Sequence, residues 1–273
     1  MINNIRIGKN LVDLVTPKVM SILNCTPDSF YSDSRIDTIS QALKKAEQHI
    51  LDGADILDIG GYSSRPGAPE VPQEEEIKRV VPVVQAIRKE FPNILISCDT
   101  FRGQVAQEAL EVGAQIINDI SGGEIDPSIL KVVSNFQCPY ILMHSKGTPQ
   151  TMHQHTQYTS LFKEVVTYFS QKLNQLQQLG INDVILDPGF GFAKTLEQNY
   201  DLLNRLSDLH FLGKPLLVGI SRKSMIYNKL GITPEESLNG TTVLHTKALL
   251  SGAKILRVHD TKEAKQVIQI MGL

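Results

Sequence analysis

Eight short apolar runs, each ending abruptly in polar residues, constrain the fold of this chain more than any other feature. They cover residues 19–23, 56–59, 94–96, 116–117, 140–143, 184–186, 216–220 and 255–258. Between most of them lie segments with apolar residues at helical spacing, such as Ile39, Ala42, Leu43, Ala46 and Ile50. Fully apolar strands that alternate with amphipathic helices are typical of a parallel sheet whose outer face is covered by helices.

A weak internal repeat distinguishes a closed barrel from an open sheet. Every second run, beginning with the second, follows a glycine that suits a helix end; these are Gly53, Gly113, Gly180 and Gly252. The other runs follow a proline at or near their start; these are Pro17, Pro92, Pro139 and Pro215. The alternation indicates four βαβα quarters. We therefore expect an α/β fold, a single (β/α)₈ TIM barrel over residues 1–273, with its active site at the carboxyl ends of the strands.

Charge and cysteine content exclude several classes of partner. A formal net charge of -2 and scattered basic residues argue against nucleic acid as a partner. No apolar run approaches the roughly 18 residues of a membrane span, and no secretory signal pattern opens the chain. Cys25, Cys98 and Cys138 lack metal-binding spacing and are expected to be buried and reduced. A cytoplasmic enzyme that contacts neither membrane nor nucleic acid is the expectation.

The polar residues that leave the apolar runs predict one anionic-substrate site, because the strand ends of such a barrel converge. A single Asp after a strand is more often a helix cap or turn former, but every strand contributes at least one polar residue. Hydrogen-bond donors suited to a multiply charged anion are Asn24, Ser64, Arg65, Arg257 and His259. Acceptors suited to the N–H edges of a heterocycle are Asp99, Asn118 and Asp187. The pattern indicates a flat, amide-like ring that carries phosphate.

Two motifs resemble those of a known family. Residues 24–30, Asn-Cys-Thr-Pro-Asp-Ser-Phe, resemble the N-x-T-P-D-S-F signature of the dihydropteroate synthases, and residues 58–67 resemble their second signature. The likeness continues in order through shorter matches at 99–100, 118–122, 143–149, 187–192, 219–224 and 257–260. It thus extends over all eight expected units.

The resemblance implies a transferase of folate biosynthesis and a sulfonamide target. Such an enzyme condenses 6-hydroxymethyl-7,8-dihydropterin diphosphate with p-aminobenzoate, giving 7,8-dihydropteroate and diphosphate. An aniline nitrogen is a weak nucleophile, which favours an SN1-like order with diphosphate leaving first. The resemblance also implies Mg²⁺ as cofactor and a homodimer.

Residue roles follow from the same likeness. The residues expected to bind the pterin are Asp99, Asn118, Met143, Asp187, Gly219, Lys223 and Arg257. Diphosphate would bind to Asn24, Ser64, Arg65, Arg257 and His259, with Asn24 also as the Mg²⁺ ligand. The p-aminobenzoate site would comprise Phe30, Ser64, Pro66, Phe190, Lys223 and Ser224. Those expected to act in catalysis are Asn24, Arg65, Lys223, Arg257 and His259.

Two rival functions share part of this pattern. A methyltetrahydrofolate–corrinoid methyltransferase would need the heterocycle acceptors but not the phosphate set of Arg65, Arg257 and His259. A catalytically silent pterin-binding paralogue would be marked by loss of a phosphate ligand, and none is lost here. The chain departs from the usual family pattern at Tyr62, Ser63 and Ser64 of the second loop, and at Ala193, where glycine is usual.

Overall fold

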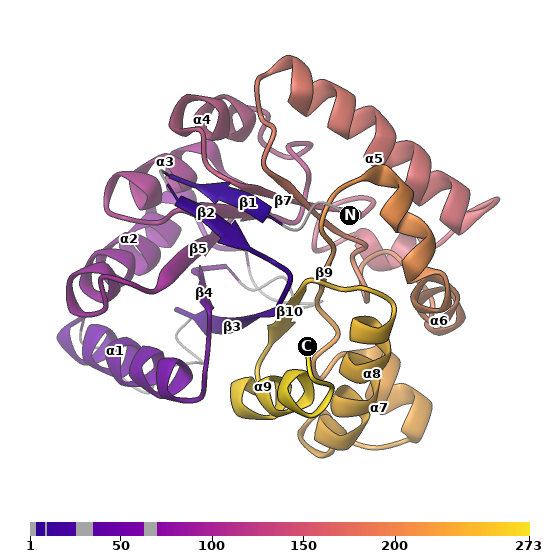
Figure 1. The fold of residues 1–273 in the computed structure, drawn as a ribbon. Coiled ribbons are helices and arrows are strands. Elements are labelled where there is room, and N and C mark those ends of the chain that lie inside the picture. The colour runs from indigo at the N-terminus through magenta and orange to yellow at the C-terminus, as the bar shows by residue number, and fades with distance from the viewer. Residues whose placement is uncertain (1–3, 9, 26–34, 63–69) are drawn as a thin grey trace.

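The structure, a computed structural model, describes residues 4–8, 10–25, 35–62 and 70–273 and has the expected parallel barrel (Figure 1). Its strands are β3 (Lys18–Asn24), β4 (Ile56–Gly60), β5 (Leu95–Asp99), β6 (Ile116–Asp119), β7 (Tyr140–Met143), β8 (Val184–Asp187), β9 (Leu217–Val218) and β10 (Ile255–Val258). They pair in the order β8-β7-β6-β5-β4-β3-β10-β9. A parallel bridge between Leu186 and Leu216 joins the two ends of this order. The eight-stranded barrel predicted from the apolar runs is therefore confirmed.

Helices surround the strands and bury the outer face of the barrel (Figure 1). They are α1 (Arg35–Leu51), α2 (Gln73–Glu90), α3 (Gly103–Glu111), α4 (Ser128–Phe136), α5 (Leu161–Gln178), α6 (Leu196–Asn204), α7 (Ser224–Leu230), α8 (Leu238–Leu250) and α9 (Thr261–Ile270). Short 3₁₀ helices are η2 (Met152–Gln154), η3 (Leu206–Leu212) and η4 (Glu235–Ser237). The apolar stripe predicted around Ala42 and Ala46 lies on α1, where both residues are fully buried.

The four glycines of the internal repeat have the predicted backbone conformation. Each follows the end of a helix, and their φ angles are 95° at Gly53, 119° at Gly113, 75° at Gly180 and 86° at Gly252. Residues other than glycine rarely adopt positive φ, so the position explains the residue type. Thr38 and Gln41 have the spacing of a capping box, but α1 begins at Arg35, so Thr38 lies inside the helix instead of at its start. A capping box is instead formed by Thr195 and Gln198 at the start of α6.

An N-terminal hairpin, which the sequence reading missed, lies across one end of the barrel (Figure 1). Its strands are β1 (Asn4–Ile7) and β2 (Asn10–Asp13), paired antiparallel. Ile5, Ile7 and Leu14 pack with the inward-facing residues at the amino ends of the barrel strands; those are Met20, Ile56, Ile116, Ile141, Ile185, Leu217 and Ile255. This apolar layer closes the bottom of the barrel.

The next inward layer carries most of the polar side chains inside the barrel. Successive side chains of a strand point to opposite faces, so residues two positions beyond the apolar layer also point into the barrel. From β4 to β10 these residues are Asp58, Ser97, Asn118, Met143, Asp187, Gly219 and Arg257. Strand alternation alone thus brings seven strands' contributions to one level, just above the closed end.

Candidate functional site

A buried network of charges joins opposite walls of this polar layer. Arg257 Nε donates to Asp58 Oδ2 at 2.6 Å, and its Nη2 donates to Asp99 Oδ2 at 2.5 Å. Asn118 Nδ2 donates to the same Asp58 oxygen at 3.0 Å. Residues from β4, β5, β6 and β10 therefore meet, as predicted for Asp99, Asn118 and Arg257. Asp58 was not singled out from the sequence, although its position two residues after Ile56 could have revealed it.

A second group lies on the β7–β9 side. Met143 and Asp187 are register partners at the carboxyl ends of β7 and β8, and both are buried. Asp187 Oδ1 accepts a hydrogen bond from the backbone N–H of Gly189 at 2.8 Å. Gly219 is buried so close to Lys223 and Arg257 that a methyl group there would lie 3.7 Å from Lys223 Nζ and 3.8 Å from Arg257 Cβ. A glycine here leaves the space beside both cations open.

Burial shifts the acid–base properties of these groups. Burial raises the pKa of Asp99 to about 7, although Arg257 opposes the shift. It also raises the pKa of Asp187, against the opposing charge of Lys223. For Lys223, burial lowers the pKa to about 8. Burial would lower the pKa of Arg257, but Asp58 and Asp99 outweigh it and raise the value. The carboxylates and cations are thus mutually dependent for their charge, a common property of ligand-binding sites.

Asn24, His259 and Ser224 stand at the edge of this network. Asn24 ends β3 and pairs in register with Gly60. His259 follows β10, and its Nδ1 lies 3.1 Å from Ser221 Oγ. Ser224 is the first residue of α7, directly after Lys223. All three are partly buried, which leaves part of each residue accessible.

Other polar residues at strand ends have structural roles. Asp119 accepts hydrogen bonds from Tyr140 Oη, at 2.6 Å, and from the backbone of Gly123, so it organises the turn after β6. Arg222 donates to Asp260 through two nitrogens and so links the loop after β9 to the residues after β10. His144 is buried behind the β8 loop rather than facing the network.

The two phenylalanines after β8 differ in position. Phe190, which the sequence reading placed against p-aminobenzoate, has a fully buried side chain in the outer core. Only its carbonyl reaches the site, where it accepts a 2.6 Å hydrogen bond from Lys223 Nζ. Phe192 instead is partly exposed, with Lys223 Nζ 4.7 Å from the centre of its ring. Of the two, only Phe192 presents its ring beside Lys223.

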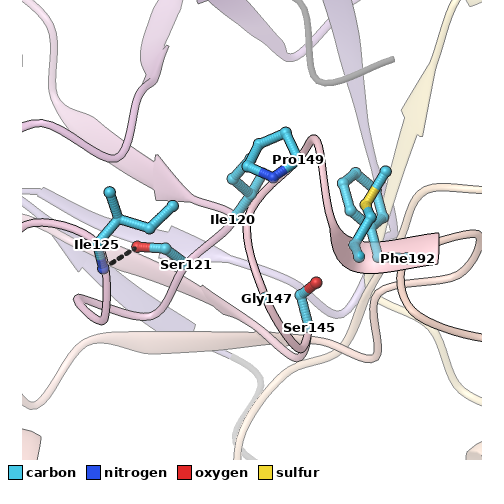
Figure 2. Close-up of a pocket in the computed structure, with 8 residues that line it drawn as sticks. Ile120, Ser121, Ile125, Ser145, Gly147, Pro149 and Phe192 are labelled. Carbon is cyan, nitrogen blue, oxygen red and sulfur yellow. Dashed lines mark hydrogen bonds between the residues drawn. The ribbon is translucent and has the colours of Figure 1, made fainter. Parts of the chain in front are cut away.

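Phe192 also forms one wall of a small pocket between the loops after β6, β7 and β8 (Figure 2). The other lining residues are Ile120, Ser121, Ile125, Ser145, Gly147, Pro149 and Met152. Figure 2 shows Ser121 turned toward the backbone of Ile125, whose N–H donates to its hydroxyl at 3.5 Å. Charged side chains are absent from this lining among the described residues, so the pocket does not suit a phosphate group.

Comparison with known proteins assigns the chain to a family. A family model described as "Pterin binding enzyme" matches residues 20–259. Dihydropteroate synthase of Escherichia coli (strain K12) is 44% identical over 262 residues, covering 95% of this chain and 92% of the relative. The dihydropteroate synthase of Synechocystis sp. is 45% identical over 255 residues, covering 92% and 88%. The chain belongs to the dihydropteroate synthase family.

Solved structures of dihydropteroate synthases share the fold closely. The Yersinia pestis enzyme in a sulfonamide drug complex has a TM-score of 0.92 at 40% identity, covering 98% of each chain. The Xanthomonas albilineans enzyme with 4-aminobenzoic acid has a TM-score of 0.92 at 34% identity, covering 99% of this chain and 97% of its own. Like those relatives, the chain is a transferase of folate biosynthesis. Within the described ranges, no helix is long and apolar enough to cross a membrane.

The described departures from the usual dihydropteroate synthase pattern have clear surroundings. Tyr62 packs edge-on against Phe101, with the Arg102 guanidinium 5.6 Å from its ring centre, and its hydroxyl accepts from Gln150 Nε2 at 2.5 Å. Ala193 has a left-handed φ of 48°, which explains why glycine is usual there. Phe30, Ser64, Arg65 and Pro66, like Ser63, lie outside the described residues.

Proposed function

We propose that the network at the carboxyl ends of the strands is the site where dihydropterin diphosphate and p-aminobenzoate are joined. The observation that carries this proposal is the division of one buried layer into acceptors and cations. Asp187 and Asn118 supply acceptors for a heterocycle, while Arg257 of the same layer and Lys223, beside Gly219, supply positive charge. The family's activity, formation of 7,8-dihydropteroate with release of diphosphate, needs both.

In this proposal, the pterin lies across Asp99, Asn118 and Asp187. Asp187 accepts hydrogen bonds from the 2-amino group and a ring N–H of the pterin. Its Oδ1 is oriented by the N–H of Gly189, and the buried carboxylate points into the barrel. Asn118 and Asp99 bind the remaining ring nitrogens, and Lys223 donates to the carbonyl side. Met143 and Gly219 form the walls of the slot. Arg257, tied to Asp58 and Asp99, would contact the ring from the phosphate side.

Diphosphate would be held by Arg257, His259 and Asn24, together with Ser64 and Arg65. Preorganised donors stabilise charge that develops on a leaving group. As the C–O bond to diphosphate breaks, the pterin methylene carbon becomes electron-poor. The weakly nucleophilic aniline nitrogen then forms the C–N bond and loses a proton to solvent. This SN1-like order places the catalytic demand on Asn24, Arg65, Lys223, Arg257 and His259.

The donor set fits Mg²⁺ that arrives with the substrate. The described residues contain no cluster of three or more His, Cys, Asp or Glu able to hold a metal by themselves. Mg²⁺ favours a few protein oxygens plus phosphate oxygens and water, and the amide oxygen of Asn24 at the end of β3 is one suitable protein ligand. When bound, the ion would neutralise charge on the leaving diphosphate.

For p-aminobenzoate, we propose Lys223, Ser224 and the ring of Phe192, with Phe30, Ser64 and Pro66 by family likeness. Phe192 replaces Phe190 because only the former presents its ring beside Lys223. The methyltransferase alternative is not favoured, since a relative that matches 95% of this chain at 44% identity is a dihydropteroate synthase. A silent paralogue has no support in the described network, whose charged members are all present.

Two further proposals concern the whole molecule. We propose a homodimer, since α8 presents Val243 and Leu250 on one face with 58% and 76% of their surface exposed. We also propose a cytoplasmic location, because all three cysteines are free and buried, as is usual in reducing compartments. We expect small-molecule substrates and neither a nucleic acid nor a membrane as a partner.

One assay tests the proposed reaction. The protein is incubated with dihydropterin diphosphate and Mg²⁺, with and without p-aminobenzoate, and both diphosphate and 7,8-dihydropteroate are measured. Amine-dependent formation of dihydropteroate in equal amount to diphosphate is the expected result. Release of diphosphate without dihydropteroate at saturating amine would count against the condensation, and neither product would support the silent paralogue.

A further inference from the structure

A buried lysine behind the pterin-facing loop has no role in the proposed reaction. Lys194 is only 8% exposed, and its Nζ lies within hydrogen-bonding distance of four acceptors. These are the carbonyl oxygens of Gly189 at 2.9 Å, Phe192 at 3.0 Å and His144 at 3.3 Å, and His144 Nδ1 at 3.1 Å. An ammonium group buried at such a cost needs a compensating function or structure.

The contacts identify Lys194 as a hydrogen-bond donor. An ammonium group has three N–H donors and no acceptor, and three of its four partners are carbonyl oxygens that only accept. His144 then accepts at Nδ1, which places its ring proton on Nε2. Burial, with the neighbouring Lys194 charge, lowers the pKa of His144 to about 2, so the imidazole stays neutral. Burial also lowers the pKa of Lys194 to about 7, although the charge of Asp187 opposes the shift. The three carbonyl acceptors match the three N–H groups of the ammonium form, in which the pair is a cation and a neutral acceptor.

These bonds fasten the β8 loop to the end of β7. Gly189 approaches His144 so closely that a methyl group on Gly189 would lie 2.0 Å from the His144 carbonyl oxygen. Lys194 Nζ donates to the carbonyl oxygens of both residues, so it bridges the two loops where they come together. The lysine thus holds two loops at a distance that only a glycine permits.

The loop that Lys194 holds in place positions one group that faces the pterin and another that faces the amine. Gly189, whose carbonyl binds Lys194, donates its N–H to Asp187 Oδ1. Phe192, whose carbonyl also binds Lys194, carries the ring beside Lys223. The Lys194 charge additionally favours the ionised form of Asp187.

We propose that Lys194 is a positioning residue, which orients Asp187 toward the pterin and Phe192 toward the amine by clamping the β8 loop onto His144. The inference rests on the proposed function of Asp187 and Phe192. It adds a residue that touches neither substrate. Its loss would loosen the pterin acceptor without removing any ligand-binding atom.

The test replaces the charge while keeping an unbranched side chain. In Lys194→Met, we expect the KM for dihydropterin diphosphate and its Kd by calorimetry to rise about tenfold or more. At saturating pterin, kcat should fall much less. A residue that merely stabilises the fold would lower the active fraction, and hence kcat, at unchanged KM.

Lys214→Met is the matched control, because Lys214 also donates from Nζ to a backbone carbonyl, that of Asn182 at 2.8 Å. Asn182 precedes β8 and Lys214 precedes β9, so this bond lies at the amino ends of the strands. Lys214→Met should leave KM unchanged. If the wild-type protein is active and Lys194→Met has the same KM and Kd, the proposed function stands and the inference is overturned. Wild type without activity would instead overturn the function itself.

A second measurement on the unaltered protein applies even if Lys194→Met does not fold. Nitrogen-15 NMR of labelled histidine should show His144 neutral, with Nδ1 unprotonated and Nε2 protonated. The signal is assigned by its loss in His144→Asn. Protonation at Nδ1 would remove the acceptor that Lys194 requires and would overturn the inference.

Discussion

Asp187 is the residue whose chemistry is most directly tied to pterin recognition. Asp187→Asn retains shape and the acceptor for Gly189, but turns an NH₂ group toward the pterin donors. Loss of a hydrogen bond to a charged group costs about 1.5–3 kcal/mol, so pterin diphosphate should bind roughly ten- to a hundredfold more weakly in calorimetry. Asp183→Asn, at the opposite end of β8, is the control. Equal pterin binding by Asp187→Asn and wild type would refute the assigned role.

Asp99 should make folding stability depend on pH. Its pKa rises from 3.8 to about 7 on folding because of burial, so between those values the folded state binds the extra proton. Stability therefore falls as pH rises through this window. Compared with wild type, Asp99→Asn should become progressively more stable from about pH 5 to pH 8 in urea unfolding, while binding pterin less well. Asp208→Asn, at an exposed position, is the control, and a flat difference for Asp99→Asn would contradict the assignment.

Strand periodicity predicts some of the site residues but not those in the loops. Within strands, alternation fixes which side chain points inward, so Asp99, Asn118 and Asp187 could be placed on one wall. The Gly-Phe-Gly-Phe segment after β8 lies outside any strand, and its two glycines have positive φ, so strand alternation does not apply to its phenylalanines. Phe190 turned into the core and Phe192 toward Lys223, and only the three-dimensional path of the loop distinguishes them.

At the scale of elements, strand order was predictable because apolar runs and helix-ending glycines repeat. The N-terminal hairpin was not, since Ile5 and Ile7 form a segment too short for periodicity to distinguish from an irregular terminus. The role of this hairpin is evident only from the apolar layer that it forms together with Met20 and Ile255. Burial against partners distant in sequence, rather than local propensity, defines this element.

The hairpin should therefore contribute to stability and not to binding. Leu14, just after β2, is 1% exposed within the bottom layer, and Leu→Ala at such sites costs about 2–5 kcal/mol. Leu14→Ala should lose that much unfolding free energy in urea titration while its pterin Kd stays unchanged. Leu11→Ala, 69% exposed on the same hairpin, should be near neutral. A large change in Kd for Leu14→Ala would mean that the two ends of the barrel are coupled.

At the scale of the whole molecule, α8 carries exposed apolar residues that the packing of a single barrel does not explain. Its sequence, LNGTTVLHTKALL, places apolar residues on the solvent side as well as the core side. Val243 and Leu250 are seven residues apart, so they share one face, and Leu230 at the end of the neighbouring α7 is 56% exposed. A stable protein–protein interface buries about 1,200–2,000 Å² in total, more than these three side chains supply, so adjoining parts of both helices must take part.

Val243→Glu would place a charge at the centre of that face and should convert a dimer to a monomer in sedimentation velocity at micromolar concentration, because an unpaired charge is costly to bury. Leu51→Glu, at the end of α1 and 75% exposed, should leave the dimer intact. Since the polar layer of the barrel comes from a single chain, the monomer should still bind pterin. A wild type that sediments as a monomer would reject the homodimer, and a dimeric Val243→Glu would place the interface on another face.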